Sequence, residues 1–445
     1  MQSNECASCR QAGSLEPIRK YDPPAEHRSV GDHACFDGVD LVTLARCVGT
    51  PFHAYSASAI RQRIDTLHGQ LRGLDAQVCF AAKANSNGAV LALMHEAGVG
   101  ADIVSAGELR RSLRAGIPSS RIVFSGVGKT ANEIAEALAA GIARFNVESL
   151  QELQLLQQIA LEHGAVACAA VRINPDVDAR THQKISTGKA GDKFGVSIAE
   201  ARRWFADSAR FTHVRLDGLH IHIGSQILTI EPFRVALRRL AAFWRELTDA
   251  GHAINSIDVG GGLGVCYRPH EERPIPLTGY VETIRAELRG FHGRLVLEPG
   301  RWLVAEAGIL VTRVIRVKPG DPRPFLVIDA AMNDLARPSL YDAWHEVLAL
   351  SASPGPGVAY DIVGPVCESG DTFAQARDLP QCEAGDLLLI AGTGAYGASM
   401  ASTYNSRPLA AEVMLDCGRY SVVRRRQTFD EMIAGEQPAE EWQCA

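Results

Sequence analysis

The sequence of 445 residues lacks a long apolar run, which argues against a helical membrane protein. No apolar stretch approaches the roughly 20 residues that a spanning helix needs. The first residues, MQSNECASCRQAG, also lack the apolar core of a secretory signal peptide. We therefore expect no membrane partner and a cytoplasmic location.

The chain also lacks a strong charge of either sign and a disulfide framework. Its 45 basic and 51 acidic residues leave a formal net charge of −6, which gives no reason to expect a nucleic acid as partner. The 11 cysteines are odd in number and follow no framework spacing, so we expect free thiols in a reducing compartment. Cys6 and Cys9 form one C-x-x-C motif, but no second pair supports a zinc site, and we expect no metal.

Short apolar segments alternate with helical patterns between about residues 77 and 300. The apolar segments do not alternate with polar residues, which is typical of parallel strands buried on both faces. Helical patterns such as Ala57–Leu71 and Ala131–Ala140 precede or separate them, and Gly98, Gly116, Gly141 and Gly251 fall just past helix ends. Eight strands joined in this way predict an α/β fold with a (β/α)8 TIM barrel, and a doubly wound open sheet is the alternative. The expected strands are Gln77–Lys83, Ala101–Ser105, Arg121–Gly126, Ala143–Glu148, Ala165–Asn174, Val214–Ser225, Ser256–Gly262 and Arg294–Gly300.

The pattern changes after about residue 302. Val311–Lys318 and Glu412–Arg426 alternate with period two, and three further apolar segments, PFLVIDA, YDIVGP and DLLLIAG, are strand candidates. Only Tyr341–Leu348 has a helical pattern, so we expect a C-terminal, mostly antiparallel β domain. The expected division is a flexible extension (1–33), a segment that joins the β domain (34–56), the barrel (57–302), the β domain (303–430) and a polar tail (431–445).

Polar and glycine residues gather where the expected barrel strands end, which is where the reacting groups of such barrels lie. Lys83, in the stretch FAAKANS, ends the first strand, and desolvation there is expected to disfavour the charged amine and favour attack on carbonyls. Each residue alone has an ordinary explanation, such as a buried histidine, a structural ion pair or a turn glycine. Their coincidence at one rim favours a functional site. The other rim residues are Asp102, Arg172, His222, Gly224, Ser225, Gly260, Gly261, Gly262, Glu298, Gly300 and Arg301.

The glycine-rich stretch Gly260–Gly264 suits a phosphate, because its backbone N–H groups are free of side-chain obstruction. It does not match the dinucleotide motif G-x-G-x-x-G, because Val265 occupies the place of the third glycine. A lysine, a phosphate cradle and the carboxylate of Glu298 together indicate pyridoxal 5′-phosphate. A barrel that uses its lysine directly, as aldolases do, leaves Glu298 and the stretch HIGS unexplained.

A set of motifs, in order from about Phe36 to Phe429, resembles the diaminopimelate decarboxylase family. This family belongs to the alanine racemase-like group of pyridoxal phosphate enzymes, which includes eukaryotic ornithine decarboxylase. The resemblance implies decarboxylation of meso-2,6-diaminopimelate to L-lysine and CO2, the last step of lysine biosynthesis, in a homodimer with active sites at the subunit interface. The motifs are FAAKANS, ADIVSAGEL, FSGVGKT, FNVES, RINPDVDARTH, ISTGKAGDKFG, HIHIGSQ, DVGGGLG, EPGR, MNDLARPSLYDAWHE, GPVCESGD, GAYGASM and YNSRPLAAEV.

The resemblance also implies roles for single residues. Lys83 and Cys367 are the implied catalytic residues: the lysine carries the cofactor, and the thiol returns a proton from the partner subunit. Glu298 replaces the arginine of the related racemases, which favours decarboxylation. The implied cofactor ligands are Lys83, Asp102, Arg172, His222, Ser225, Gly261, Gly262, Glu298, Gly300, Arg301 and Tyr396. The implied substrate ligands are Arg301, Arg337, Tyr341, Glu368 and Tyr396, with Tyr396 acting across the interface and Ile185–Gly188 as a mobile cover.

Other interpretations stay open at this stage. Cys367 is compatible with an inert small residue, and Arg337 and Tyr341 with a domain interface. The chain is also compatible with an inactive homologue that regulates a partner, or with a related decarboxylase for lysine, ornithine, a carboxynorspermidine-type polyamine or a carrier-bound amino acid. Thr393 stands where the family usually has an aspartate or a similar polar residue, which puts the geometry near Tyr396 in doubt.

Overall fold

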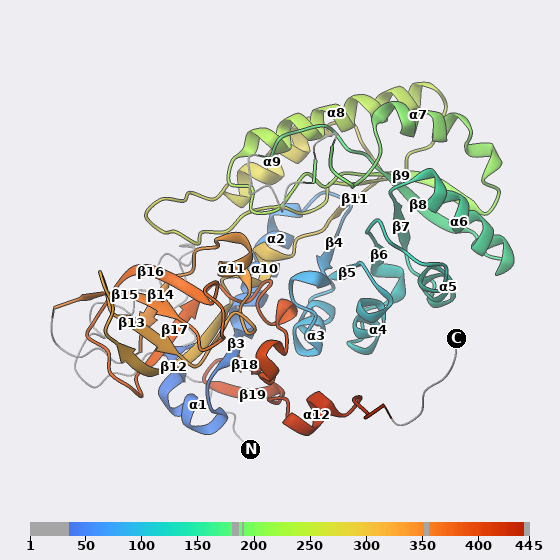
Figure 1. The fold of residues 1–445 in the computed structure, drawn as a ribbon. Coiled ribbons are helices and arrows are strands. Elements are labelled where there is room, and N and C mark those ends of the chain that lie inside the picture. The colour runs from blue at the N-terminus through green and yellow to red at the C-terminus, as the bar shows by residue number, and fades with distance from the viewer. Residues whose placement is uncertain (1–34, 180–186, 189–190, 351–355, 440–445) are drawn as a thin grey trace, which may run out of the picture.

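The computed structural model describes residues 35–179, 187–188, 191–350 and 356–439. These residues form a closed barrel and a second large sheet, which lie beside each other (Figure 1). Cys6 and Cys9 lie outside the described residues. Among the helices of the described ranges, none combines the length and the apolar character that crossing a membrane requires.

Eight parallel strands close the barrel, in the order β10-β11-β4-β5-β6-β7-β8-β9. All eight predicted strands are present with slightly different ends, and the closure excludes the open sheet. Most of their side chains are buried, which explains why the apolar residues do not alternate with polar ones. The strands are β4 (Ala76–Ala81), β5 (Gly100–Ile103), β6 (Ile122–Phe124), β7 (Arg144–Val147), β8 (Ala167–Arg172), β9 (Val214–His220), β10 (Ser256–Asp258) and β11 (Arg294–Leu297).

Helices surround the barrel strands, and side-chain caps fix where several of them begin (Figure 1). The hydroxyls of Ser56, Ser105, Thr130, Ser149 and Ser197 each accept a hydrogen bond from a backbone N–H of the first turn. The four predicted glycines past helix ends all have positive φ, a conformation that favours glycine. The helices are α2 (Ala57–Leu71), α3 (Gly88–Glu96), α4 (Ala106–Arg114), α5 (Ala131–Ala140), α6 (Leu150–Glu162), α7 (Ile198–Ala206), α8 (Ile230–Asp249), α9 (Leu277–Glu287) and the short α10 (Arg301–Val304).

The second sheet is mostly antiparallel, as predicted. Its main path runs β16-β15-β13-β12-β3-β18-β19, with β17 paired to β12 and β14 paired to β17. Only the pairs β13–β15 and β3–β18 are parallel among the described strands of this sheet. The strands are β3 (Phe52–Ser56), β12 (Gly308–Lys318), β13 (Phe325–Ile328), β14 (Val347–Ala349), β15 (Val358–Val363), β16 (Thr372–Leu379), β17 (Leu387–Ala391), β18 (Ala411–Asp416) and β19 (Arg419–Arg424).

Short elements complete the described chain. The N-terminal part begins with β1 (Cys35–Phe36), β2 (Val39–Asp40) and α1 (Leu41–Val48), and the helix α12 (Phe429–Ile433) lies near the C-terminal end. Strand β3 follows α1 and pairs with β12 and β18, so a segment from before the barrel lies inside the second sheet.

The predicted helix over Tyr341–Leu348 is wrong. A shorter helix, α11 (Arg337–Tyr341), lies before it, and Asp342 ends that helix with φ 52°. Pro338 explains the earlier start, because proline fits the first turn of a helix. Val347 and Leu348 instead pair with β17, so sheet hydrogen bonds outweigh the local helical pattern.

A loop of the second domain is hydrogen-bonded to the turn that carries Lys83. This turn, η3 (Ala82–Ala84), follows β4, and the Ala84 carbonyl accepts a hydrogen bond from the Tyr396 N–H at 2.8 Å. The Asn85 side chain donates to the Gly394 carbonyl at 3.0 Å. The loop after β17 is therefore fixed against the barrel rim.

Candidate active site

A cavity of about 190 Å³ lies between the C-terminal ends of the barrel strands and the loop after β17. Most of the rim residues predicted from the sequence line it. The barrel contributes Ala81, Lys83, Thr187, His222, Ser225, Gly262, Leu263, Glu298, Pro299, Gly300, Arg301 and Trp302. The second domain contributes Arg337, Tyr341 and Tyr396. The cavity is thus built where the two parts of the chain meet.

Lys83 is paired with a fully buried carboxylate. Its Nζ donates a hydrogen bond to Asp102 Oδ2 at 2.9 Å. Burial by itself lowers the pKa of Lys83, but the combined effect of Asp102, Tyr396 and Glu298 is larger and raises the pKa above its ordinary value. Desolvation thus acts in the expected direction, but the anionic neighbours favour the charged amine.

Glu298 is a buried anion held by three donors. His220 Nε2 donates to one oxygen at 3.2 Å, and Ser125 Oγ and Asn146 Nδ2 donate to the other at 3.3 and 3.1 Å. Burial raises the pKa of Glu298, but His220, Lys83 and Asp258 together have the larger effect and lower the pKa below its ordinary range. A carboxylate that stays ionised at this depth suits a protonated ring nitrogen.

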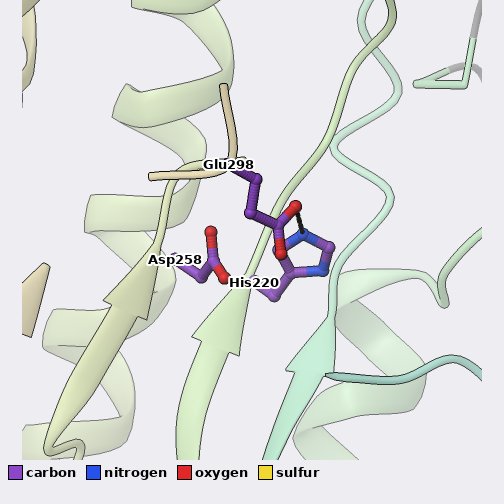
Figure 2. Close-up of side chains that lie close together, drawn as sticks. All are labelled: His220, Asp258 and Glu298. Carbon is purple, nitrogen blue, oxygen red and sulfur yellow. Dashed lines mark hydrogen bonds and ion pairs between the residues drawn. The ribbon is translucent and has the colours of Figure 1, made fainter. Parts of the chain in front are cut away.

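Figure 2 shows Asp258 beside Glu298 and His220, at the ends of three adjacent strands. Ligand atoms of the three lie within 4.8 Å of one another. Burial and the neighbouring Glu298 raise the pKa of Asp258 well above its ordinary value, since two adjacent buried carboxylates do not both ionise readily. Both Glu298 oxygens already accept hydrogen bonds, so we assign this cluster to the support of Glu298 rather than to a metal.

His222 is held neutral at the cavity wall. Its Nδ1 accepts a hydrogen bond from the Gly261 N–H at 3.2 Å. Burial, together with the charges of Arg172 and Lys83, lowers the pKa of His222 well below its ordinary value. A neutral imidazole suits contact with a flat ring, which is the role that the resemblance implies.

The glycine-rich loop is packed too closely for any side chain. An added Cβ would meet the Ile221 carbonyl at 2.3 Å from Gly260, the Glu298 carbonyl at 2.1 Å from Gly261, and the Gly224 carbonyl at 2.4 Å from Gly262. Gly262, with φ +99°, lines the cavity itself. Backbone N–H groups can therefore approach a ligand here, as a phosphate site requires.

Two buried arginines lie at the cavity with aromatic neighbours. Arg301 donates to the Tyr267 hydroxyl at 2.8 Å and to Ser225 Oγ at 3.1 Å, and its guanidinium lies 4.7 Å from the ring centre of Tyr396. Arg337 lies 4.4 Å from the ring centre of Tyr267 and hydrogen-bonds to His345 at 2.9 Å. Among the described residues, no carboxylate forms an ion pair with either arginine.

Sequence reasoning missed Tyr267 and His345. Neither lies at a predicted strand end, and Tyr267 lies 34 residues from Arg301 in sequence, whereas His345 lies only 8 residues from Arg337. A weak signal was present, since Tyr267 follows the glycine loop directly and His345 lies within the motif MNDLARPSLYDAWHE.

Two predicted site residues and the predicted cover have surroundings that differ from the expectation. Arg172 does not line the cavity; it pairs with Glu148 at 2.8 Å and lies over Phe194. Tyr396 lines the cavity of its own chain, whereas the resemblance implies that it acts across the interface. Within the predicted cover Ile185–Gly188, Thr187 lines the cavity, whereas 185–186 lie outside the described residues.

Cys367 and Glu368 do not line this cavity. Both are exposed, and they lie in the turn between β15 and β16. The Cys367 N–H donates to Asn405 Oδ1 at 3.1 Å, and Glu368 accepts a hydrogen bond from the Tyr404 hydroxyl at 2.8 Å. The side chains of these two residues are therefore exposed on the surface of the second domain.

The residues present fit pyridoxal 5′-phosphate. A lysine amine, an ionised buried carboxylate, a neutral imidazole and a close-packed glycine loop meet at one cavity. Asp102 Oδ1 is a buried oxygen for which the described residues provide no hydrogen-bond donor. Lys83 would hold the aldehyde carbon, Glu298 the ring nitrogen, and Ser225 with Gly262 the phosphate.

Comparisons with known proteins agree with this chemistry. The pyridoxal-binding domain of pyridoxal-dependent decarboxylases matches residues 57–305. Diaminopimelate decarboxylase of Zymomonas mobilis is 46% identical over 91% of this chain and 97% of its own length, and that of Pseudomonas aeruginosa is 47% identical over 90% and 96%. The crystal structure of diaminopimelate decarboxylase from Helicobacter pylori with L-lysine superposes with a TM-score of 0.85, at 41% identity over 88% of this chain and 98% of that one. The chain therefore belongs to the diaminopimelate decarboxylase family of pyridoxal-dependent decarboxylases.

Proposed function

We propose that this protein decarboxylates meso-2,6-diaminopimelate to L-lysine and CO2, the last step of lysine biosynthesis, with pyridoxal 5′-phosphate as cofactor. The relatives that cover most of the chain carry this enzyme name. The structural observation that carries the proposal is the pair of buried arginines without a carboxylate partner among the described residues. A buried charge without a counter-ion is costly, so the cavity is suited to an anionic ligand.

Diaminopimelate offers two carboxylates, one at each end. The carboxylate at the reacting end leaves as CO2, and the distal one remains in the product. The forked donors of Arg301 and Arg337 suit this distal group, and Tyr341 lines the same cavity. A substrate that ends in a plain amine, such as ornithine or lysine reacting at its α-carbon, has no distal anion to satisfy the two guanidiniums.

The cofactor supplies a ring that accepts the electron pair left when the bond to CO2 breaks. Within the protein, ionised Glu298 would favour a proton on the ring nitrogen, and His222 would lie beside the ring. Asp102 holds the Lys83 amine at 2.9 Å, ready to be exchanged for the amino group of the substrate. Lys83, His222 and Glu298 line the cavity, which supports these proposed roles.

A second copy of the chain is part of the proposal. Cys367 and Glu368 are exposed and lie away from the cavity of their own chain, although the resemblance gives them a proton-donating and a substrate-binding role. The exposed position of these residues and their implied roles agree if the surface of one copy covers the cavity of the other in a homodimer. The small-molecule site is then complete only in the dimer. We also place the enzyme in the cytoplasm, where the free cysteines stay reduced.

The test compares substrates for the protein loaded with cofactor. CO2 release is measured with meso-diaminopimelate, L-lysine and L-ornithine at matched concentrations. We expect kcat/KM for diaminopimelate to exceed the other two by roughly 100-fold or more, because each of those leaves buried charges unpaired. Activity on lysine or ornithine together with inactivity on diaminopimelate would contradict the proposal.

A further inference from the structure

His345 makes an unusual pair with Arg337, because its partner is already a cation. Arg337 Nη1 lies 2.9 Å from His345 Nε2, and both side chains are buried. A guanidinium only donates hydrogen bonds, so the imidazole nitrogen must accept. The imidazole is therefore neutral whenever this hydrogen bond is present.

The other ring nitrogen fixes the tautomer. His345 Nδ1 lies 2.8 Å from the Ala391 carbonyl, which can only accept, so Nδ1 carries the proton and Nε2 is left with a lone pair. Burial and the charge of Arg337 lower the pKa of His345 to about 3, which agrees with this geometry. The end of β17 thus orients the ring, and the ring orients Arg337.

The rest of the surroundings hold Arg337 without neutralising it. The ring of Tyr267 lies against its guanidinium, and the same tyrosine accepts a hydrogen bond from Arg301. Arg337 Nε is buried and has no hydrogen-bond partner among the described residues. A carboxylate in place of His345 would cancel the charge, whereas a neutral acceptor fixes the side chain and leaves its charge for a ligand.

We propose that His345 is a positioning residue that holds Arg337 for the distal carboxylate of the substrate, and so helps the cavity to select amino acids with an anionic far end. This inference rests on the proposed function, since it assigns the recognition of that substrate to one more residue. His345 acts through Arg337 and takes no part in the bond changes of the reaction.

Two small molecules isolate the contribution of the distal carboxylate. L-lysine keeps this carboxylate after CO2 has left, and cadaverine is the same five-carbon diamine without it. Their inhibition constants against diaminopimelate turnover therefore report how tightly Arg301 and Arg337 bind the distal carboxylate, separately from the binding of the amines. We expect the unchanged protein to bind L-lysine more tightly than cadaverine.

The decisive variant is His345→Asn. The asparagine amide nitrogen takes the place of Nδ1 and can donate to Ala391, but the side chain is too short to reach Arg337. We expect the inhibition constant of L-lysine and the KM of diaminopimelate to rise about 10- to 100-fold, because a hydrogen bond to a charged group is lost. The kcat value should change by less than about threefold, because binding of the distal carboxylate contributes equally to the ground state and the transition state. The inhibition constant of cadaverine should also change by less than about threefold, because cadaverine lacks this carboxylate.

Two further variants separate positioning from damage. His345→Gln can reach Arg337 with its amide oxygen and donate with its nitrogen, so it should restore much of the preference for L-lysine. Trp344→Phe is the matched control in the same segment, because the Trp344 ring packs on Arg377. It should leave the preference unchanged. If the asparagine variant does not fold, judged by thermal melting and by cofactor absorbance, His345→Phe replaces it with the same expectation.

Different results contradict the proposed function and the role of His345. A parent protein that does not decarboxylate diaminopimelate overturns the proposed function. If the parent protein is active, the role of His345 alone is contradicted when His345→Asn weakens the binding of L-lysine and of cadaverine equally, or weakens the binding of neither.

Discussion

The pKa of Lys83 is higher than the apolar strand before it predicts. The apolar run before it predicts desolvation, which lowers the pKa of an amine. The opposing carboxylate comes from the next strand, where β4 and β5 pair with Ala81 beside Asp102. Strand register decides this pairing, and the register was not available from the sequence. The amine must therefore lose its proton within this pair before it attacks a carbonyl.

Tyr267 and His345 show a second limit of sequence reasoning at the residue scale. A strand-end pattern finds residues that point from the barrel rim, such as Glu298 and Arg301. It does not find side chains that reach the site by packing on another side chain. The contact between Arg337 and Tyr267 joins a helix of the second domain to a barrel loop, which only the folded chain brings together.

Cys367→Ala tests the proposed proton donor. We expect the variant to bind the cofactor with an unchanged absorption spectrum, because Cys367 lies away from the cavity of its own chain. Turnover of diaminopimelate should fall roughly 10²- to 10⁴-fold, the usual cost of losing a positioned acid. Cys382→Ala, which changes a buried cysteine of the second domain core, is the control for mutation of a thiol. Equal activity in the Cys367 variant and the parent would remove Cys367 from the mechanism.

At the scale of elements, the glycine-rich loop after β10 is fixed by packing. Each of Gly260, Gly261 and Gly262 faces a backbone carbonyl of a neighbouring strand end or loop at a distance that excludes a Cβ. The sequence predicted the stretch as a phosphate cradle. The structure adds that the loop reaches its position only because it has no side chains there.

Gly262→Ala should therefore weaken cofactor binding. Its φ of +99° and the 2.4 Å approach to the Gly224 carbonyl force the loop to shift. We expect the dissociation constant of pyridoxal phosphate to rise roughly 10-fold or more, since such backbone strain costs about 1–3 kcal/mol. Gly279→Ala in α9 has open space around it and is the matched control, with unchanged affinity expected. Equal affinity in the two variants would show that the loop geometry is not required for the phosphate.

Local patterns predicted long, regular elements well and short ones poorly. Helices α2 and α5 begin and end where the periodicity indicates, because a cap and a buried apolar face agree. The helix predicted over 341–348 is wrong, because the neighbouring five-residue helix α11 and the strand β14 depend on tertiary contacts. Sheet pairing at that point overrides a weak local preference.

At the scale of the whole molecule, the alternation of strands and helices was sufficient to predict the barrel. The order of strands in the second sheet was not predictable, because β3 precedes the barrel in sequence but pairs with β12 and β18. The proposed role of Cys367 requires a second copy of the chain, and the periodicity of one chain does not report assembly. The expectation that 34–56 joins the β domain is confirmed by the pairing of β3, whereas assembly stays a prediction that rests on the resemblance.

The most direct test of the account mixes two inactive variants, Lys83→Ala and Cys367→Ala. In a homodimer with shared sites, each mixed dimer holds one cavity with an intact Lys83 and an intact Cys367 from the partner. After subunit exchange, verified with differently tagged copies, lysine formation from meso-diaminopimelate should return to about a quarter of the parent activity, as random pairing of two subunits gives. Complete subunit exchange without any return of activity would contradict the proposed division of the site between two copies.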